Sequence, residues 1–143
     1  MIQTYNIANF SRTLGVLLKS GATVTEALSI TGDTLANTLY RDSCKAIAER
    51  VKKGEQMSLY LKENKKLYPS LLGHMVGIGE KTGKLSETLV YLSSLYEEEL
   101  DDQSKNLSSS IEPILMVVMG LVVGFVAVSV ITPIYSITQS LSR

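Results

Sequence analysis

A long uncharged segment near the C-terminus limits what this chain can fold into. From Ile114 to Ile131 the sequence reads ILMVVMGLVVGFVAVSVI, and no residue from Ile114 to Ser142 carries a charge. About 20 apolar residues in a helix cross the roughly 30 Å hydrocarbon core of a bilayer. A buried core helix is the alternative, but such helices seldom run this long without a polar face. We therefore expect one transmembrane helix over residues 111–136, in contact with membrane lipid, and a short tail over 137–143.

The residues before this segment, 1–110, suffice for one compact domain with its own core. The sequence holds 14 Lys and Arg against 14 Asp and Glu, so a net charge of +0 gives no reason to expect a nucleic-acid partner. Cys44 is the only cysteine, which excludes a disulfide framework and a cysteine zinc site and fits a reducing compartment. Residues 1–10 lack a basic segment followed by an apolar run, so we expect no signal peptide and place this domain in the cytoplasm.

Apolar residues recur at helical spacing throughout this domain, and no strand-like alternation appears. Pro69 suits the first turn of a fifth helix, and a long sixth helix begins at Lys84 or Leu85. Glycine readily takes the left-handed conformation that ends a helix, and glycines follow the first, third and fifth predicted helices: Gly21, Gly54 and Gly83. We predict an all-α fold, an antiparallel six-helix bundle followed by one C-terminal transmembrane helix.

The glycine-rich segment from Gly77 to Lys84 looks like a phosphate-binding loop but does not fit one. A Walker loop has four residues between its glycines, followed by Lys and Ser or Thr. Gly77 and Gly83 are separated by five residues, Gly79 and Gly83 by three, and Leu85 stands where the hydroxyl for magnesium is needed. We therefore interpret the segment as a turn between two helices and expect no nucleotide cofactor.

Glu80 is the unusual residue of this turn. It falls on the last turn of the fifth predicted helix, where the helix dipole disfavours a carboxylate. We therefore expect a compensating donor, either the backbone amides at the start of the sixth helix or Arg12 across the bundle. The alternative is a solvated glutamate beside Lys81 and Lys84.

No combination of residues in the sequence predicts catalysis or metal binding. His74 is the only histidine and has no Ser, Cys or Asp partner at a recognisable spacing. The acidic run from Glu97 to Asp102 could collect a divalent cation, but it lacks the loop glycine of an EF-hand and is typical of the solvated face of a helix. We therefore expect neither an enzyme nor a metal site.

Small residues within the apolar segment indicate close helix packing. Gly120 and Gly124 form a G-x-x-x-G pattern, and Ala127 falls close to the same face. Such a face fits either a helix dimer or packing against other spans of a larger assembly. We expect Glu112 and Pro113 at the entry to the span, and Pro133 to end or kink it.

Several short motifs, taken in order, resemble those of the F-domain family, the inner-membrane platform proteins of type II secretion and type IV pilus assembly. The similarity covers about residues 8 to 136. The matching motifs are Phe10-x-Arg12-x-Leu14-x-x-Leu17-Leu18-x-x-Gly21, Glu26-Ala27-Leu28, Val51-x-x-Gly54-x-x-Met57-Ser58, Pro69, Ile78-Gly79-Glu80-Lys81-Thr82-Gly83-x-Leu85, and Glu112-Pro113 before the apolar run with Pro133 after it. The resemblance implies structural signature residues at Arg12, Gly21, Gly54, Gly79, Glu80, Gly83, Leu85, Glu112 and Pro113.

The resemblance implies a non-enzymatic scaffold of the bacterial inner (cytoplasmic) membrane without a cofactor. Its cytoplasmic bundle would contact a hexameric assembly ATPase and other platform proteins, and work from the ATPase would extract pilin or pseudopilin subunits from the membrane. The family usually carries two such domains and several spans, whereas this chain has one of each and is similar to the C-terminal half. We expect a homo-oligomer. A tail-anchored helical adaptor or regulator unrelated to secretion is the alternative function.

We expect the ATPase to bind a basic surface formed by residues 41–66 together with the turn at Glu80 to Lys84. The expected contacts are Lys52, Lys53, Lys65, Lys66, Lys81 and Lys84.

Overall fold

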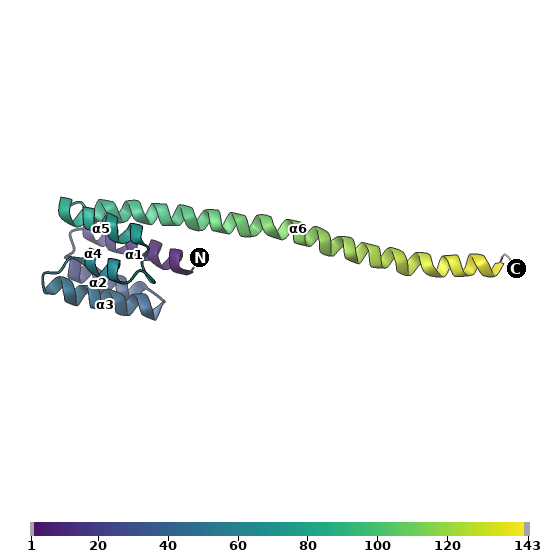
Figure 1. The fold of residues 1–143 in the computed structure, drawn as a ribbon, viewed down its shortest axis with the longest axis horizontal. Coiled ribbons are helices and arrows are strands. Elements are labelled where there is room, and N and C mark those ends of the chain that lie inside the picture. The colour runs from purple at the N-terminus through teal and green to yellow at the C-terminus, as the bar shows by residue number, and fades with distance from the viewer. Residues whose placement is uncertain (1, 142–143) are drawn as a thin grey trace. The chain divides into compact units, whose positions relative to one another are not determined.

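A computed structural model describes the backbone of residues 2–141 and the side chains of residues 2–105 and 111–129. The helices are α1 (Ile2–Lys19), α2 (Val24–Thr34), α3 (Thr38–Lys52), α4 (Met57–Glu63), α5 (Ser70–Thr82) and α6 (Leu85–Leu141). No strand occurs among the described residues. Helices α1 to α5 lie side by side with the first turns of α6 (Figure 1). The predicted all-α class and six helices are confirmed.

The helices of the bundle begin and end where local chemistry dictates. The hydroxyl of Thr23 accepts from the amide of Glu26 at the start of α2, and the side chain of Asn37 accepts from the amide of Leu39 at the start of α3. Gly83 ends α5 with a φ of 70° and an amide that donates to the carbonyl of Gly79. Gly21 and Gly54 also take positive φ, after α1 and α3. The predicted helix ends at these glycines are confirmed.

Three aromatic rings meet at the centre of the core. The Tyr68 ring, fully buried, lies 5.6 Å from the Phe10 ring and 5.5 Å from the Tyr40 ring, measured between centroids. The Tyr68 hydroxyl forms a hydrogen bond with Oγ of Ser43 at 2.7 Å. Because Tyr68 precedes α5 while Tyr40 and Ser43 lie on α3, this contact ties the α4–α5 loop to the third helix. The other fully buried large side chains are Ile7, Leu14, Leu28, Ile47, Met57, Leu61, Leu72, Val76, Leu89 and Leu92.

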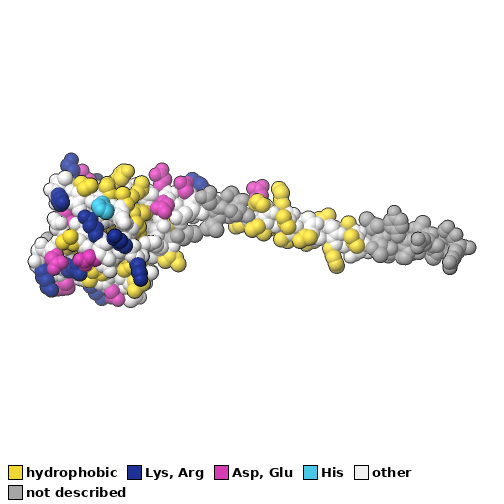
Figure 2. Space-filling model, viewed as in Figure 1, with side chains coloured by type: hydrophobic (Ala, Val, Ile, Leu, Met, Phe, Trp, Pro, Cys, Tyr) yellow, Lys and Arg dark blue, Asp and Glu magenta, His cyan; other side chains and the backbone are white. Residues whose placement is uncertain are grey.

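The chain divides into two compact units, Met1–Asp102 and Gln103–Arg143. The second unit contains a 19-residue stretch, Ile111–Ser129, with a mean hydropathy of 2.5, none of it buried. By length and composition this stretch is able to cross a membrane. Hydrophobic side chains cover it in Figure 2.

The span is the continuation of the last helix of the bundle. Helix α6 runs without a break from Leu85 to Leu141, so Glu112 and Pro113, at the beginning of the apolar stretch, lie inside one continuous helix. Proline has no amide hydrogen, so position 113 lacks one hydrogen bond to the preceding turn. The helix also continues past Pro133, which therefore does not end it. The side chain of Pro133 lies outside the described residues, as does the predicted tail at its last two positions.

Candidate functional site

The carboxylate of Glu80 caps the start of α4. Its Oε1 accepts from the amide of Met57 at 2.6 Å, and its Oε2 accepts from the amide of Ser58 at 3.2 Å. The prediction that Glu80 needs a compensating donor is therefore correct, and the alternative of a solvated glutamate is wrong. Both expected donors are also wrong. The amides belong to α4 rather than α6, and Arg12 instead pairs with Glu97 on α6.

This long-range cap compensates for a weak helix start. Helix α4 has only seven residues, and Gln56, at the position before it, makes no side-chain hydrogen bond to the helix. The first amides of a helix have no partner within the helix and carry partial positive charge. A carboxylate placed there gains from both effects, which offsets the unfavourable position of Glu80 at the C-terminal end of its own helix.

Helix α5 lies between α4 and α6, and glycines allow close approach on both flanks. Towards α6, a Cβ at position 79 would lie 2.9 Å from Oγ1 of Thr88 and 3.1 Å from Cα of Leu85. Towards α4, a Cβ at position 73 would lie 2.9 Å from Cγ of Lys62, and one at position 77 would lie 3.3 Å from Ser58. The sequence motif had indicated Gly79. Gly77, which belongs to the same glycine-rich segment, and Gly73, which lies outside it, face α4.

The lysines expected to bind a partner do not form one patch. Lys52 and Lys53 lie at the C-terminal end of α3, and Lys52 pairs with Glu49 at 2.7 Å, which lowers the pKa of that carboxyl from its ordinary value. Lys66 lies by the other end of α3, since its carbonyl accepts from Gln3 and the next carbonyl, Leu67, accepts from the Tyr40 hydroxyl. The fifteen residues of α3 span about 22 Å at 1.5 Å per residue.

The remaining expected lysines, Lys81 and Lys84, lie near the C-terminal end of α3, on the same side of the bundle as Lys52 and Lys53. Lys81 lies on the last turn of α5 and Lys84 directly before α6, both exposed. The bond from Met57 to Glu80 holds this end of α5 beside the chain that follows α3. The structure thus separates Lys65 and Lys66 from Lys52, Lys53, Lys81 and Lys84, because α3 and α4 run in opposite directions.

A groove of about 330 Å³ runs between α4 and α5. Its lining residues are Gln56, Ser58, Leu59, Lys62, His74, Gly77, Ile78 and Lys81. It carries two lysines and a histidine but no acidic side chain. His74 also contacts the carbonyl of Ser70 in its own helix through Nδ1, at 2.6 Å. Helical periodicity could have placed His74, Ile78 and Lys81 on one face of α5, but only the packing of α4 makes that face one wall of a groove.

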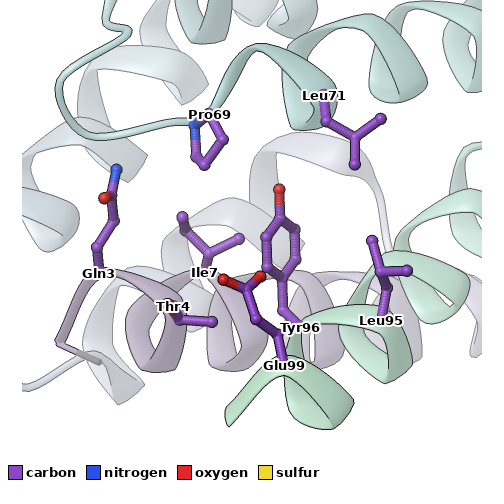
Figure 3. Close-up of a pocket in the computed structure, with 8 residues that line it drawn as sticks. All are labelled: Gln3, Thr4, Ile7, Pro69, Leu71, Leu95, Tyr96 and Glu99. Carbon is purple, nitrogen blue, oxygen red and sulfur yellow. The ribbon is translucent and has the colours of Figure 1, made fainter. Parts of the chain in front are cut away.

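A second hollow, of about 260 Å³, opens where α1, α5 and α6 meet (Figure 3). In this view the Tyr96 ring stands between Pro69 and Leu71, and Leu71 and Leu95 approach each other across the opening. Burial, followed by the charge of Glu99, raises the pKa of Tyr96, so its hydroxyl stays protonated at neutral pH. Apolar side chains of Ile7, Pro69, Leu71 and Leu95 line the hollow together with the polar groups of Gln3, Thr4, Tyr96 and Glu99.

Among the described residues, no group of three or more His, Cys, Asp or Glu side chains is placed to hold a metal ion. The acidic run from Glu97 to Asp102 lies on α6, with Glu98, Asp101 and Asp102 exposed. Glu97 pairs with Arg12. The run therefore follows the expected pattern of an exposed helix face.

The small residues of the span have no neighbour in the described part of the chain. A Cβ at Gly120 or Gly124 would meet nothing within 4 Å, and Ala127 is exposed. What this face packs against stays a prediction. Glu112 is exposed as well.

Comparisons with known proteins extend these observations. Residues 10–133 match the family described as type II secretion system (T2SS), protein F. The type IV pilus assembly protein PilC of Thermus thermophilus is 34% identical over 136 residues, which are 95% of this chain and 34% of that protein. The type II secretion system protein F of Pseudomonas aeruginosa is 29% identical over 139 residues, 97% of this chain and 34% of that protein. The chain thus spans about a third of the length of the relatives it matches.

Proposed function

Because the chain belongs to the family of type II secretion system protein F, we propose that it is a non-enzymatic platform component of the inner (cytoplasmic) membrane. It would serve a type II secretion or type IV pilus assembly machine, since relatives over nearly its whole length carry both names. The observation that carries the proposal is the family match over residues 10–133 together with an apolar helix long enough to cross a bilayer.

In this proposal residues 1–110 form the cytoplasmic F-domain, residues 111–136 cross the membrane and residues 137–143 form a short tail. Two physical observations support the division. The bundle unit has a buried core and a charged surface, as a domain in water requires. The stretch Ile111–Ser129 exposes only apolar and small side chains apart from Glu112 and Pro113 at its beginning, as a lipid-facing helix requires.

The proposed role is to couple a cytoplasmic assembly ATPase to the extraction of pilin or pseudopilin subunits from the membrane. Helix α6 supports this role because it belongs to both units without a break in the backbone. Movement of the bundle by the ATPase would therefore reach the span through continuous main chain. Other platform proteins would pack against the face of Gly120, Gly124 and Ala127, where small side chains allow close approach.

The proposal is tested by purifying the tagged full chain from its source cell in mild detergent and identifying bound proteins by mass spectrometry. We expect a hexameric secretion-type ATPase, other inner-membrane assembly proteins and pilin-like subunits. Recovery of unrelated membrane proteins alone would overturn the platform role and favour a tail-anchored adaptor.

Charge reversal tests where the ATPase binds. Because the lysines lie at two separate ends of the bundle, two double variants divide them: Lys52→Glu with Lys53→Glu, and Lys65→Glu with Lys66→Glu. We expect at least one of them to lose most of the ATPase. Lys19→Glu with Lys105→Glu, which makes the same change in net charge at other exposed positions, is the control and should retain it. Full recovery of the ATPase with both test variants would exclude Lys52, Lys53, Lys65 and Lys66 as the binding surface.

A further inference from the structure

The hollow where α1, α5 and α6 meet is lined by hydrogen-bond acceptors and by no basic side chain. Glu99 supplies a carboxylate, Gln3 an amide, and Thr4 and Tyr96 each a hydroxyl, while no Lys, Arg or His belongs to the lining. The amide nitrogen of Gln3 donates to two carbonyls of the α4–α5 loop, at 3.3 and 3.2 Å, so its oxygen remains as an acceptor. A lining of acceptors with one negative charge favours a cation that donates hydrogen bonds.

The hydroxyl of Tyr96 lies in this hollow without a partner. The residue is only 5% exposed, and Figure 3 shows its hydroxyl directed towards the gap between Pro69 and Leu71. It forms no hydrogen bond with another described residue. Buried polar groups normally have a hydrogen-bond partner, because the loss of water is otherwise uncompensated. This hydroxyl therefore points to a group that enters the hollow from outside.

The rest of the lining is apolar. Ile7, Pro69, Leu71 and Leu95 form the walls, and in Figure 3 the carboxylate of Glu99 lies between the side chains of Ile7 and Tyr96. The volume of about 260 Å³ falls below the roughly 300 Å³ at which pockets for drug-sized ligands begin. The hollow therefore suits a single long side chain with an aliphatic stem and a charged end.

The surface of α6 beside the hollow carries the same sign of charge as Glu99. Leu95, Glu99 and Asp102 follow one another at spacings of four and three residues, which places them on one face of the helix. Glu98 and Asp101, next to them in the sequence, are exposed as well. A basic segment with one side chain in the hollow would thus meet further negative charges along α6.

We propose that the hollow binds the side chain of an arginine from a basic segment of a partner protein. The aliphatic stem packs on the apolar walls, as the stems of long basic side chains do on apolar surfaces. The guanidinium donates to the carboxylate of Glu99 and the hydroxyl of Tyr96. Its five N–H groups suit several acceptors better than the compact ammonium of a lysine does. The site does not rest on the proposed function, because it requires neither an ATPase nor a pilin as the partner.

The experiment measures the fluorescence anisotropy of four labelled peptides added to the full chain in a non-ionic detergent. The peptides are identical except at two positions, which hold arginine, lysine, citrulline or glutamate. Citrulline keeps the shape of arginine but carries no charge. We expect the arginine peptide to bind about tenfold more tightly than the citrulline peptide, because hydrogen bonds between charged groups are stronger than neutral ones. The lysine peptide should lie between these two, and the glutamate peptide should not bind.

Two variants test whether the peptide occupies the hollow. Glu99→Gln should lower the affinity for the arginine peptide about tenfold and leave that for the citrulline peptide unchanged. Tyr96→Phe removes only the hydroxyl and should lower the affinity by about threefold to tenfold. Glu98→Gln is the matched control, since it makes the same change in charge at an exposed neighbour that does not line the hollow. It should lower the affinity by about twofold or less, because exposed charges are screened.

Four results would overturn the proposal. The first is no rise in anisotropy with the arginine peptide, and the second is equal affinity for the arginine and citrulline peptides. Equal losses from Glu99→Gln and Glu98→Gln would assign the binding to the acidic run as a whole. Displacement of the arginine peptide by an equal concentration of spermidine would assign the hollow to a free polyamine. Circular dichroism of each variant, compared with the unchanged chain, confirms that a loss of affinity is not a loss of folding.

Discussion

The carboxylate of Glu80, on the last turn of α5, accepts a hydrogen bond from the main-chain amide of Met57, the first residue of α4, at 2.6 Å. It joins two helices whose own termini are incompletely satisfied. The contact holds the start of α4 beside the end of α5, and the groove lies between these two helices. The turn motif that looks like a phosphate loop thus contacts α4 through Glu80 and α6 through Gly79.

Replacing Glu80 with glutamine should destabilise the bundle by about 1–2 kcal/mol, because the neutral amide loses the charge-assisted bonds to the start of α4. Cys44 supplies the measurement. It is the only cysteine and is fully buried, so a thiol reagent labels it when the bundle opens in urea. Glu98→Gln, at an exposed position on α6, is the control. An identical urea midpoint for Glu80→Gln and the unchanged chain would show that the cap contributes nothing.

Replacing Gly79 with alanine should cost about 1–3 kcal/mol, because overpacking forces neighbours apart. The new methyl group would meet backbone, Cα of Leu85 at 3.1 Å, as well as Thr88. Gly120→Ala is the matched control, since nothing lies within 4 Å of a Cβ there. The measurement is the midpoint of Cys44 labelling in urea. A midpoint for Gly79→Ala that is no lower than that for Gly120→Ala would contradict the close approach of α5 and α6.

Tyr68 and Ser43 should show coupled effects on stability. Either Tyr68→Phe or Ser43→Ala leaves one buried hydroxyl without its 2.7 Å partner and should cost about 1–3 kcal/mol. The double variant removes both hydroxyls, so its loss should be smaller than the sum of the single losses. Urea unfolding of the four chains gives the coupling energy directly. Strict additivity would mean that the two hydroxyls do not interact.

The stability of the bundle should fall at alkaline pH. Burial raises the pKa of the Cys44 thiol from 9.0 to about 12 and also raises the pKa of Tyr68. The unfolded chain releases these protons first, so the stabilisation is complete below about pH 9 and is lost as pH rises towards the folded-state values. Urea unfolding followed by tyrosine fluorescence between pH 8 and about pH 11 measures this loss. The free energy of unfolding of Cys44→Ala should fall less steeply with pH over this range. If it falls as steeply as that of the unchanged chain, the Cys44 thiol is not a source of the pH dependence.

The sequence predicted the helices and their ends well, because those depend on neighbouring residues. Gly21, Gly54 and Gly83 end helices wherever the rest of the chain lies, since only glycine takes a positive φ without strain. The long apolar segment likewise indicated a span from length and composition alone. That α6 continues through Pro113 was less evident from the sequence, because a proline weakens a helix locally but does not prevent a long helix from continuing.

The partners of charged side chains had to come from the tertiary structure. The position of Glu80 at the C-terminal end of a helix showed that its carboxylate needs hydrogen-bond donors. The first turns of α4 and α6 both offer unpaired amides, and the sequence does not say which of these two helices begins close to Glu80. Gly73 and Gly77 decide this by letting α4 pack directly on α5. The same packing divides the expected basic surface between two ends of the bundle and places Lys62 beside exposed apolar residues. The sequence thus determined which helices form and which residue lacked a partner, while packing across the bundle determined which groups meet.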